Sequence, residues 1–181
     1  MASKKTLLHI CCGVCAGETA NKLQEEGYEV TGFFYNPNIE PAEEREKRFE
    51  AAKMVSRILD FELLRDDTGA EEWKALSSGL EDEPEGGKRC ELCFRMRLAK
   101  TSSKAREAGI PIFTTTLTIS PHKNAALVNR IGRDVDSAGF LERDFKKSGG
   151  FGKAMEFAKK NSIYRQNFCG CVHSGKRGEA K

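Results

Sequence analysis

Seven cysteines fall into three short clusters, and this grouping is the clearest chemical signal in the sequence. The clusters are Cys11, Cys12 and Cys15; Cys90 and Cys93; and Cys169 and Cys171. Structural disulfides are rare in a reducing cytosol, so grouped thiols indicate a metal site or redox catalysis there. Single members could still be inert, because cysteine is among the residue types most often buried in protein cores.

The spacing of the cysteines allows two kinds of metal site. An iron-sulfur cluster needs about four thiolates, which two distant cysteine pairs can supply. The economical set for such a cluster is Cys11, Cys12, Cys90 and Cys93. Structural zinc prefers cysteines that lie two to four residues apart. That spacing occurs as two C-x2-C pairs in Cys12, Cys15, Cys90 and Cys93. Spacing alone does not choose between iron and zinc.

The third cluster, in "FCGCVHS", favours electron transfer. Only Gly170 separates Cys169 from Cys171, and a disulfide between them would close a small, strained ring. Strained disulfides are easily reduced, so the pair suits the passage of electrons better than structural crosslinking. One of the two thiols could instead supply a further metal ligand.

The elements that must position these thiols follow from the hydrophobic pattern. Buried or β-branched runs predict strands at 5–12, 29–39, 61–67 and 110–119. Helical patterns separate or follow the strands at 17–28, 41–60, 69–80, 91–108, 120–139 and 151–162. This alternation predicts an α/β fold with three α/β/α layers and a mainly parallel sheet.

Ligands of such folds bind beyond the carboxyl ends of the strands. The first cysteine cluster, the "NPN" turn at 36–38 and the polar end of the fourth strand should therefore meet at one edge of the sheet. The helix that begins near Cys90 could bring the second cluster to the same edge. Asp66 and Asp67 could act there as an oxygen ligand or a proton carrier, or be solvated. His9, inside the first strand, is expected to be a core residue.

Composition limits the class of protein. A chain of 181 residues with 39% apolar residues predicts a single domain that spans residues 1–181. No apolar run approaches the roughly 20 residues needed to cross a bilayer, so no membrane partner is expected. The N-terminus does not have the pattern of a signal peptide, which makes the cytoplasm the expected location.

The formal net charge of +3 is unevenly distributed. Residues 146–181, a predicted helix and tail, carry nine Lys or Arg against Glu156 and Glu179. A basic C-terminal region suggests a polyanion as partner, and nucleic acid is the usual one. A solvated helix face with a lysine-rich tail would show the same charge, so charge alone does not decide the partner.

Five stretches together resemble the epoxyqueuosine reductases of the QueH type, which complete the queuosine nucleoside in tRNA. They are "LLHICCGVC" (7–15), "GFFYNPNI" (32–39), "EDEPEGGKRCELCFRMRL" (81–98), "FTTTLTISPHKN" (113–124) and "YRQNFCGCVHS" (164–174). The resemblance implies a fold similar to the HUP (adenine-nucleotide hydrolase-like) type. The chain has no SGG-x-D-S pyrophosphatase loop, so adenylation by ATP is not expected. Family members usually carry "CAPC" where this chain has "CGVC", although the cysteines agree.

The resemblance implies an iron-sulfur oxidoreductase that converts epoxyqueuosine to queuosine in the tRNA anticodon loop, with an unidentified electron donor. By motif, the 4Fe-4S ligands would be Cys11, Cys12, Cys90 and Cys93, and the redox-active pair would be Cys169 and Cys171. We add the hypothesis of a further mononuclear iron held near Cys15 and Asp67.

A modified base that is splayed out of the anticodon loop can stack on aromatic rings while basic residues bind the phosphates. The expected substrate contacts are Tyr35, Asn36, Asn38, Tyr164, Arg165, Lys159 and Lys160. Two other functions remain open from the sequence. One is a zinc-stabilised RNA-binding module, and the other is an iron-sulfur enzyme that transfers sulfur to RNA from a persulfide on the third cluster.

Overall fold

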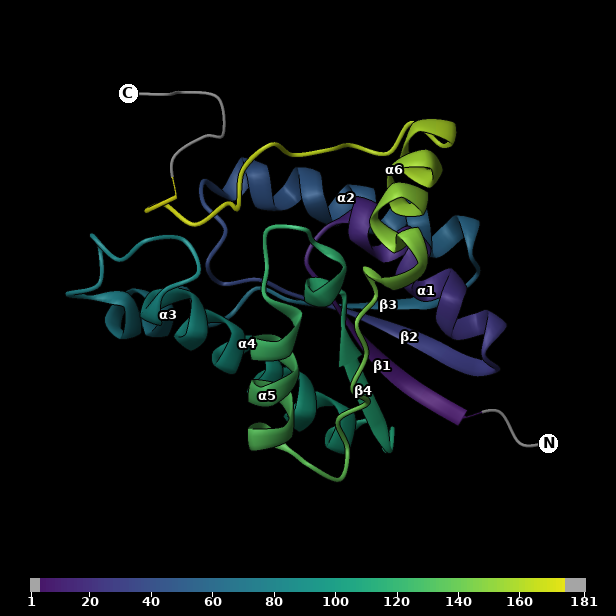
Figure 1. The fold of residues 1–181 in the computed structure, drawn as a ribbon, viewed down its shortest axis with the longest axis horizontal. Coiled ribbons are helices and arrows are strands. Elements are labelled where there is room, and N and C mark those ends of the chain that lie inside the picture. The colour runs from purple at the N-terminus through teal and green to yellow at the C-terminus, as the bar shows by residue number, and fades with distance from the viewer. Residues whose placement is uncertain (1–3, 175–181) are drawn as a thin grey trace.

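The structure, a computed structural model, describes residues 4–174 (Figure 1). The end of the predicted basic tail, 175–181, lies outside the described residues. The sheet has the strand order β3-β2-β1-β4, with β1 (Lys4–Ile10), β2 (Tyr28–Tyr35), β3 (Glu62–Asp66) and β4 (Ile112–Thr115). The helices are α1 (Gly13–Glu25), α2 (Ala42–Ile58), α3 (Ala70–Ser77), α4 (Lys88–Glu107), α5 (Ala125–Val135) and α6 (Gly150–Lys160). Short 3-10 turns occupy Thr116–Ile119 and Lys147–Gly149.

Helices cover both faces of the sheet. Helices α1, α2 and α6 pack together on one face, and α3, α4 and α5 lie on the other (Figure 1). All strand pairs are parallel, so the predicted three-layer α/β/α architecture is confirmed. Strands covered on both faces tend to be continuously buried, as β1 is from Thr6 to Ile10. Within residues 4–174, no helix has the length and apolar character needed to span a bilayer.

The strand register brings several chain segments to one edge of the sheet. Strand β1 pairs with β2 up to Ile10↔Phe34, and with β4 up to His9↔Thr115. The residues that follow these strands therefore emerge side by side. A hydrogen bond from the Cys11 amide to Thr116 Oγ1, 3.2 Å long, links two of these segments directly.

Two boundaries differ from the sequence prediction near the fourth strand. The strand ends at Thr115, because the Thr115 hydroxyl accepts a hydrogen bond from the Leu117 amide and starts the 3-10 turn. The next helix begins at Ala125 and not near Ser120, since the side chain of Asn124 accepts from the Leu127 amide at 3.1 Å and caps the helix. The segment between them is free to form a wall of the cavity described below.

Helix α4 begins at Lys88, three residues before the predicted start, so Cys90 and Cys93 lie in its first two turns. Helix α1 begins at Gly13, where it packs against the backbone of α2. A Cβ atom at Gly13 would lie 2.7 Å from the carbonyl carbon of Ala51, which is closer than real Cβ contacts. Only glycine fits there without displacing a helix, and the contact fixes the start of α1 relative to α2.

Candidate functional site

The first cysteine cluster lies where β1 turns into α1. Cys12 is the N-terminal capping residue of α1, and Cys15 lies in its first turn. The Sγ atoms of Cys11 and Cys12 are 3.8 Å apart. The three Sγ atoms of Cys11, Cys12 and Cys15 all lie within 4.8 Å of one another, and all three residues are buried. This group could hold a metal ion, and within residues 4–174 it is the only group of three or more potential ligands that is so close.

The three thiols share their protons unequally. Hydrogen bonds from the Cys12 and Cys15 thiols hold the pKa of Cys11 well below its usual value. The same bonds raise the pKa of Cys12 to about 11 and that of Cys15 well above its usual range. The hydroxyl of Thr116 also donates to Cys11 Sγ at 3.3 Å. In the absence of a metal, therefore, the group favours one thiolate, and metal binding would release the remaining protons.

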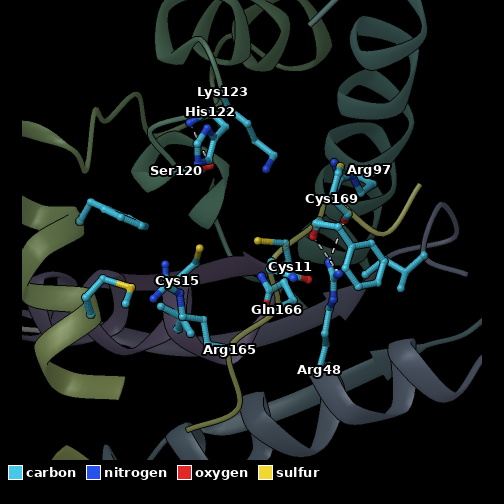
Figure 2. A pocket seen from close by; sticks show the side chains of 16 residues that line it. Cys11, Cys15, Arg48, Arg97, Ser120, His122, Lys123, Arg165, Gln166 and Cys169 are labelled. Carbon is cyan, nitrogen blue, oxygen red and sulfur yellow. Dashed lines mark hydrogen bonds between the residues drawn. The ribbon is translucent and has the colours of Figure 1, made fainter. Parts of the chain in front are cut away.

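A cavity of about 250 Å³ opens beside this group (Figure 2). Its cysteines are Cys11, Cys15 and Cys169, and its basic residues are Arg48, Arg97, His122, Lys123 and Arg165. In Figure 2, Lys123 extends toward the thiols from one side, and Arg48 lies on the opposite side. Apolar side chains of Phe151, Met155 and Phe168 complete part of the wall. We refer to it as the first cavity.

The second cysteine cluster and the third line a smaller cavity of about 40 Å³, which we call the second cavity. Its cysteines are Cys90, Cys93, Cys169 and Cys171. Four residues, Arg97, His122, Lys123 and Cys169, line both cavities, so the two adjoin. The structure therefore brings the second cluster near the first, as the sequence analysis allowed, and it adds the third cluster, whose Cys169 lines both cavities.

Arg97 on α4 is the most unusual charged residue of the site. Its side chain is buried and donates to two neutral oxygens, the Cys93 carbonyl at 3.4 Å and Asn36 Oδ1 at 3.2 Å. Among the described residues it forms no ion pair with a carboxylate. Burial opposes its charge, but electrostatic attraction to Cys93, Cys11 and Cys169 outweighs burial and raises the pKa of Arg97. A buried cation without an anionic partner is costly, so the site is built to contain negative charge.

Lys123 adds a second positive charge between the cavities. Burial opposes its charge too, while electrostatic attraction to Cys169, Cys11 and Cys15 raises the pKa of Lys123. The start of α1 contributes in the same sense, because the first amides of a helix carry partial positive charge. Cations and helix dipole together favour thiolates, which are the form in which cysteine binds a metal.

Three of the predicted substrate contacts, Tyr35, Asn36 and Asn38, do not line the two cavities. Tyr35 is buried and its ring stacks on Phe33, with centroids 5.9 Å apart. Asn36 is buried too, and its side chain bridges the Ile10 carbonyl to Arg97. Asn38 is buried and does not line either cavity. These three residues therefore lie behind the site in this structure and do not face the cavities.

The C-terminal candidates lie closer to the solvent. Arg165 is exposed and lines the first cavity. Tyr164 is about one-third exposed, but its hydroxyl donates to Glu44 at 2.8 Å. Lys159 and Lys160 are exposed in the last turn of α6. The basic side chains that the sequence predicted for this region are thus exposed, and of these three Arg165 alone lines the first cavity.

Asp67 is not brought to Cys15. It is exposed, lies 2.6 Å from the Arg65 guanidinium, and lines a different, open hollow next to Tyr35 and Lys100. The hypothesis of an iron held jointly by Cys15 and Asp67 is therefore not supported by this geometry. Asp66 is likewise engaged elsewhere, in an ion pair with Lys100 at 3.0 Å.

His9 is a core residue, as expected from its position inside a strand. Its ring nitrogens lie 2.9 Å from Thr115 Oγ1 and 3.1 Å from the Tyr35 carbonyl oxygen. Burial, followed by the charge of Arg97, lowers its pKa to about 4. His9 is therefore neutral near pH 7 and positions strand ends without contributing charge.

The sequence prediction did not include Arg48, Arg97, Lys123 or Gln166. For Arg97 a signal exists, since Cys90, Cys93 and Arg97 are spaced three and four residues apart and so share one face of α4. Arg48 stands in the run "EEREKRFE", which is typical of a solvated helix face. Gln166 lines the first cavity, and its buried Oε1 has no hydrogen-bond partner among the described residues.

Comparison with known proteins gives the family. The sequence model described as "Epoxyqueuosine reductase QueH" matches residues 6–177. The chain is 38% identical to the epoxyqueuosine reductase QueH of Streptococcus pyogenes serotype M1, over 94% of this chain and 70% of the relative. It is 35% identical to that of Thermotoga maritima, over 93% of this chain and 88% of the relative. For the protein of Dehalococcoides mccartyi the identity is 33%, over 94% of this chain and 92% of the relative. The chain therefore belongs to the epoxyqueuosine reductase QueH family, a family of oxidoreductases.

Proposed function

We propose that this chain is a single-domain cytoplasmic enzyme that reduces epoxyqueuosine to queuosine in the anticodon loop of tRNA. The observation that carries the proposal is the convergence of three cysteine clusters around a buried Arg97 that has no carboxylate partner within residues 4–174. Family membership supplies the reaction, and the cavity geometry supplies a place for it. The electron donor is a separate partner whose identity is left to experiment.

The donor set fits an iron-sulfur cluster. Iron-sulfur clusters take thiolates, and every cysteine of the first two clusters is buried or half-buried. Arg97 and Lys123 line both adjoining cavities and supply positive charge there. We assign the 4Fe-4S ligands as Cys11, Cys12, Cys90 and Cys93. Ligands of a cubane bind different irons, so they need not be as close together as Cys11, Cys12 and Cys15. When bound, such a cluster supplies electrons one at a time.

The overall reaction requires two electrons and two protons, because an epoxide becomes an alkene and one water molecule. The dithiol of Cys169 and Cys171 releases two electrons and two protons when it forms a disulfide, which balances one turnover. We therefore assign these two residues as a redox-active pair that shares the reduction with the metal centre. The position of Cys169 on the wall of both cavities supports this role.

The first cavity is suited to hold the reacting part of the substrate. Its volume of about 250 Å³ lies near the lower end for small-molecule sites. The base would leave its stack and enter beside Phe151 and Phe168, with the unpartnered Gln166 Oε1 accepting a hydrogen bond from a ring N–H. Lys123 Nζ would donate to the epoxide oxygen and stabilise the negative charge that develops as the C–O bond breaks.

The function is tested with protein purified without oxygen and incubated with dithionite and tRNA that carries epoxyqueuosine. Nucleoside mass spectrometry should show loss of one oxygen atom, and protein stripped of metal should leave the substrate unchanged. A colourless, zinc-containing protein that binds tRNA without changing it would replace the proposal with an RNA-binding module. Appearance of a thiolated base would indicate sulfur transfer in its place.

The last turn of α6 is proposed to bind tRNA phosphates. The double variant Lys159→Glu with Lys160→Glu should weaken tRNA binding about tenfold or more and flatten its salt dependence, because each lost phosphate contact removes about one unit of slope. The measurement is fluorescence anisotropy across a salt series. A matched control is Lys4→Glu with Lys5→Glu, two exposed lysines at the amino end of β1, away from the site edge. If the two double variants bind tRNA with equal affinity, the last turn of α6 is not part of the tRNA interface.

A further inference from the structure

The segment 161–174, which carries Cys169 and Cys171, has no helix or strand of its own. In Figure 1 it runs from the end of α6 across α2. Backbone groups of such a segment need partners from elsewhere in the protein if the segment is to hold one conformation. For residues 168–170 the partners are Arg48, in the second turn of α2, and Glu40, two residues before that helix.

Arg48 on α2 binds two consecutive carbonyl groups of this segment. Its Nη1 donates to the Cys169 carbonyl at 2.8 Å, and its Nη2 donates to the Phe168 carbonyl at 3.0 Å. The guanidinium also lies over the Phe168 ring, 5.1 Å from its centroid. Arg48 is buried, so these charge-assisted bonds are shielded from water. The planar guanidinium can hold both carbonyls at once, which a lysine cannot do.

Glu44 orients Arg48 and also binds Tyr164, a further residue of the segment. The buried Glu44 carboxylate accepts from Arg48 Nε at 2.6 Å through one oxygen. Through its other oxygen it accepts from the Tyr164 hydroxyl at 2.8 Å. Tyr164 and Cys169 are thus held by one ion pair on adjacent turns of α2. We call Glu44, Arg48 and Tyr164 the α2 clamp.

Gly170 shows how closely the clamp fits. Its φ of +94° lies in the region that favours glycine, and a Cβ atom there would lie 3.0 Å from Arg48 Nη1. The Gly170 carbonyl accepts from the Glu40 amide at 2.9 Å. Residues 168, 169 and 170 are therefore each held through their main-chain carbonyls. In this clamped conformation Cys169 and Cys171 are free thiols.

We propose that Arg48 is a positioning residue that holds the Cys169–Gly170–Cys171 segment in its dithiol conformation and thereby opposes formation of the disulfide. The inference rests on the proposed redox role of this pair. Contacts that are made by one form stabilise that form relative to the other. The clamp therefore makes the disulfide easier to reduce, which keeps the pair ready to be restored between turnovers.

The test measures the dithiol–disulfide equilibrium of the intact protein in anaerobic glutathione buffers without substrate. Differential alkylation followed by trypsin isolates the peptide 166–176, which contains Cys169 and Cys171 and no other cysteine. Arg48→Gln should shift the equilibrium at least tenfold toward the disulfide, which equals 29.6 mV for this two-electron couple. Arg48→Lys should shift it nearly as far, because charge without the planar group does not hold two carbonyls.

Two further variants separate positioning from general damage to the fold. Tyr164→Phe removes one hydroxyl at a partly exposed position and should shift the equilibrium in the same direction by a smaller factor. Arg65→Gln is a matched control, since Arg65 also joins an ion pair and lies 4.2 Å from the centroid of the Phe49 ring, yet it does not touch the segment. It should leave the equilibrium unchanged.

An equilibrium that is unchanged in Arg48→Gln and Tyr164→Phe, or one that moves toward the dithiol, would overturn the proposal. A shift of equal size in Arg65→Gln would do so as well, because it would reflect general loosening. The readout uses no substrate, so it fails independently of the proposed function. Absence of epoxide reduction by the wild-type protein would reject the function while leaving the clamp measurement intact.

Discussion

Cys93→Ala is expected to remove iron and acid-labile sulfide from anaerobically purified protein, and with them all measurable epoxide reduction. Cys93 lies in the second turn of α4, is buried, and faces the second cavity together with Cys90. Burial raises the pKa of its thiol to about 12, so without a metal it would stay a protonated, inert group. Loss of one ligand of the proposed cluster would leave an iron open to solvent and oxygen, and the cluster would not survive purification.

The matched variant is Cys15→Ala, which separates the two ligand sets that the geometry offers. If the cluster is bound by Cys11, Cys12, Cys90 and Cys93, the Cys15 variant keeps its brown colour and its iron and sulfide. If the metal belongs to the tight group of Cys11, Cys12 and Cys15, the outcome is reversed and our ligand assignment is wrong. Zinc in place of iron and sulfide in the wild type would contradict both assignments and favour a structural site.

Arg97→Met is expected to lower the reduction potential of the metal centre and to slow epoxide reduction. A positive charge buried next to a thiolate-bound centre favours the more negative, reduced state, so its removal makes each added electron less favourable. We expect at least a tenfold change in the reduction equilibrium, about 59 mV for a one-electron couple. Loss of activity should be about 10- to 100-fold, typical of residues that support a metal site without binding it. The measurement is a redox titration followed by electron paramagnetic resonance.

The control for Arg97 lies on the same helix. Arg95 is exposed and pairs with Asp134 at 3.3 Å, so Arg95→Met should leave the potential unchanged. Metal-free Arg97→Met should unfold no more easily than the metal-free wild type, because it loses a buried charge that has no carboxylate partner. An unchanged potential at full iron content would show that Arg97 has only a structural role.

The architecture was largely predictable from the sequence, because strands buried on both faces and amphipathic helices have distinct patterns. The predicted boundaries were wrong at two places where local hydrogen bonds determine the end of a strand and the start of a helix. Ser120 and Pro121 have the residue types of a helix start, but Asn124 caps α5 instead, and the fourth strand stops when Thr115 starts a 3-10 turn.

The part of the candidate site that could be predicted is the part whose chemistry is evident from residue type alone. Clustered cysteines are easy to recognise in any sequence, and parallel strand topology explains why the first cluster lies at the functional edge of the sheet. Tyr35, Asn36 and Asn38 were expected to face the substrate because they follow a strand at the correct edge. The C-terminal segment instead covers this turn, through the bond from the Glu40 amide to Gly170, and that contact spans 130 positions of the chain.

Buried cations were the least predictable part. Arg48 and Arg97 occur in helices rich in charged residues, where most arginines are solvated. Their role depends on what packs opposite them, the carbonyls of residues 168 and 169 for one and the cysteine cavities for the other. Such contacts arise from tertiary structure, and of the two arginines only Arg97, which shares a helix face with Cys90 and Cys93, has a signal in the sequence spacing.

The contact of Gly13 with Ala51 has a mechanical consequence. It joins α1, whose first turn carries Cys15, to α2, which carries Arg48, at a point where Gly13 lies directly against Ala51. A hinge or sliding motion between these helices would pull their main chains apart or make them collide, so the first turn of α1 and the segment 161–174 that Arg48 holds are expected to move as one body. A change in the width of the first cavity is therefore expected from the opposite wall, which includes His122 and Lys123 (Figure 2).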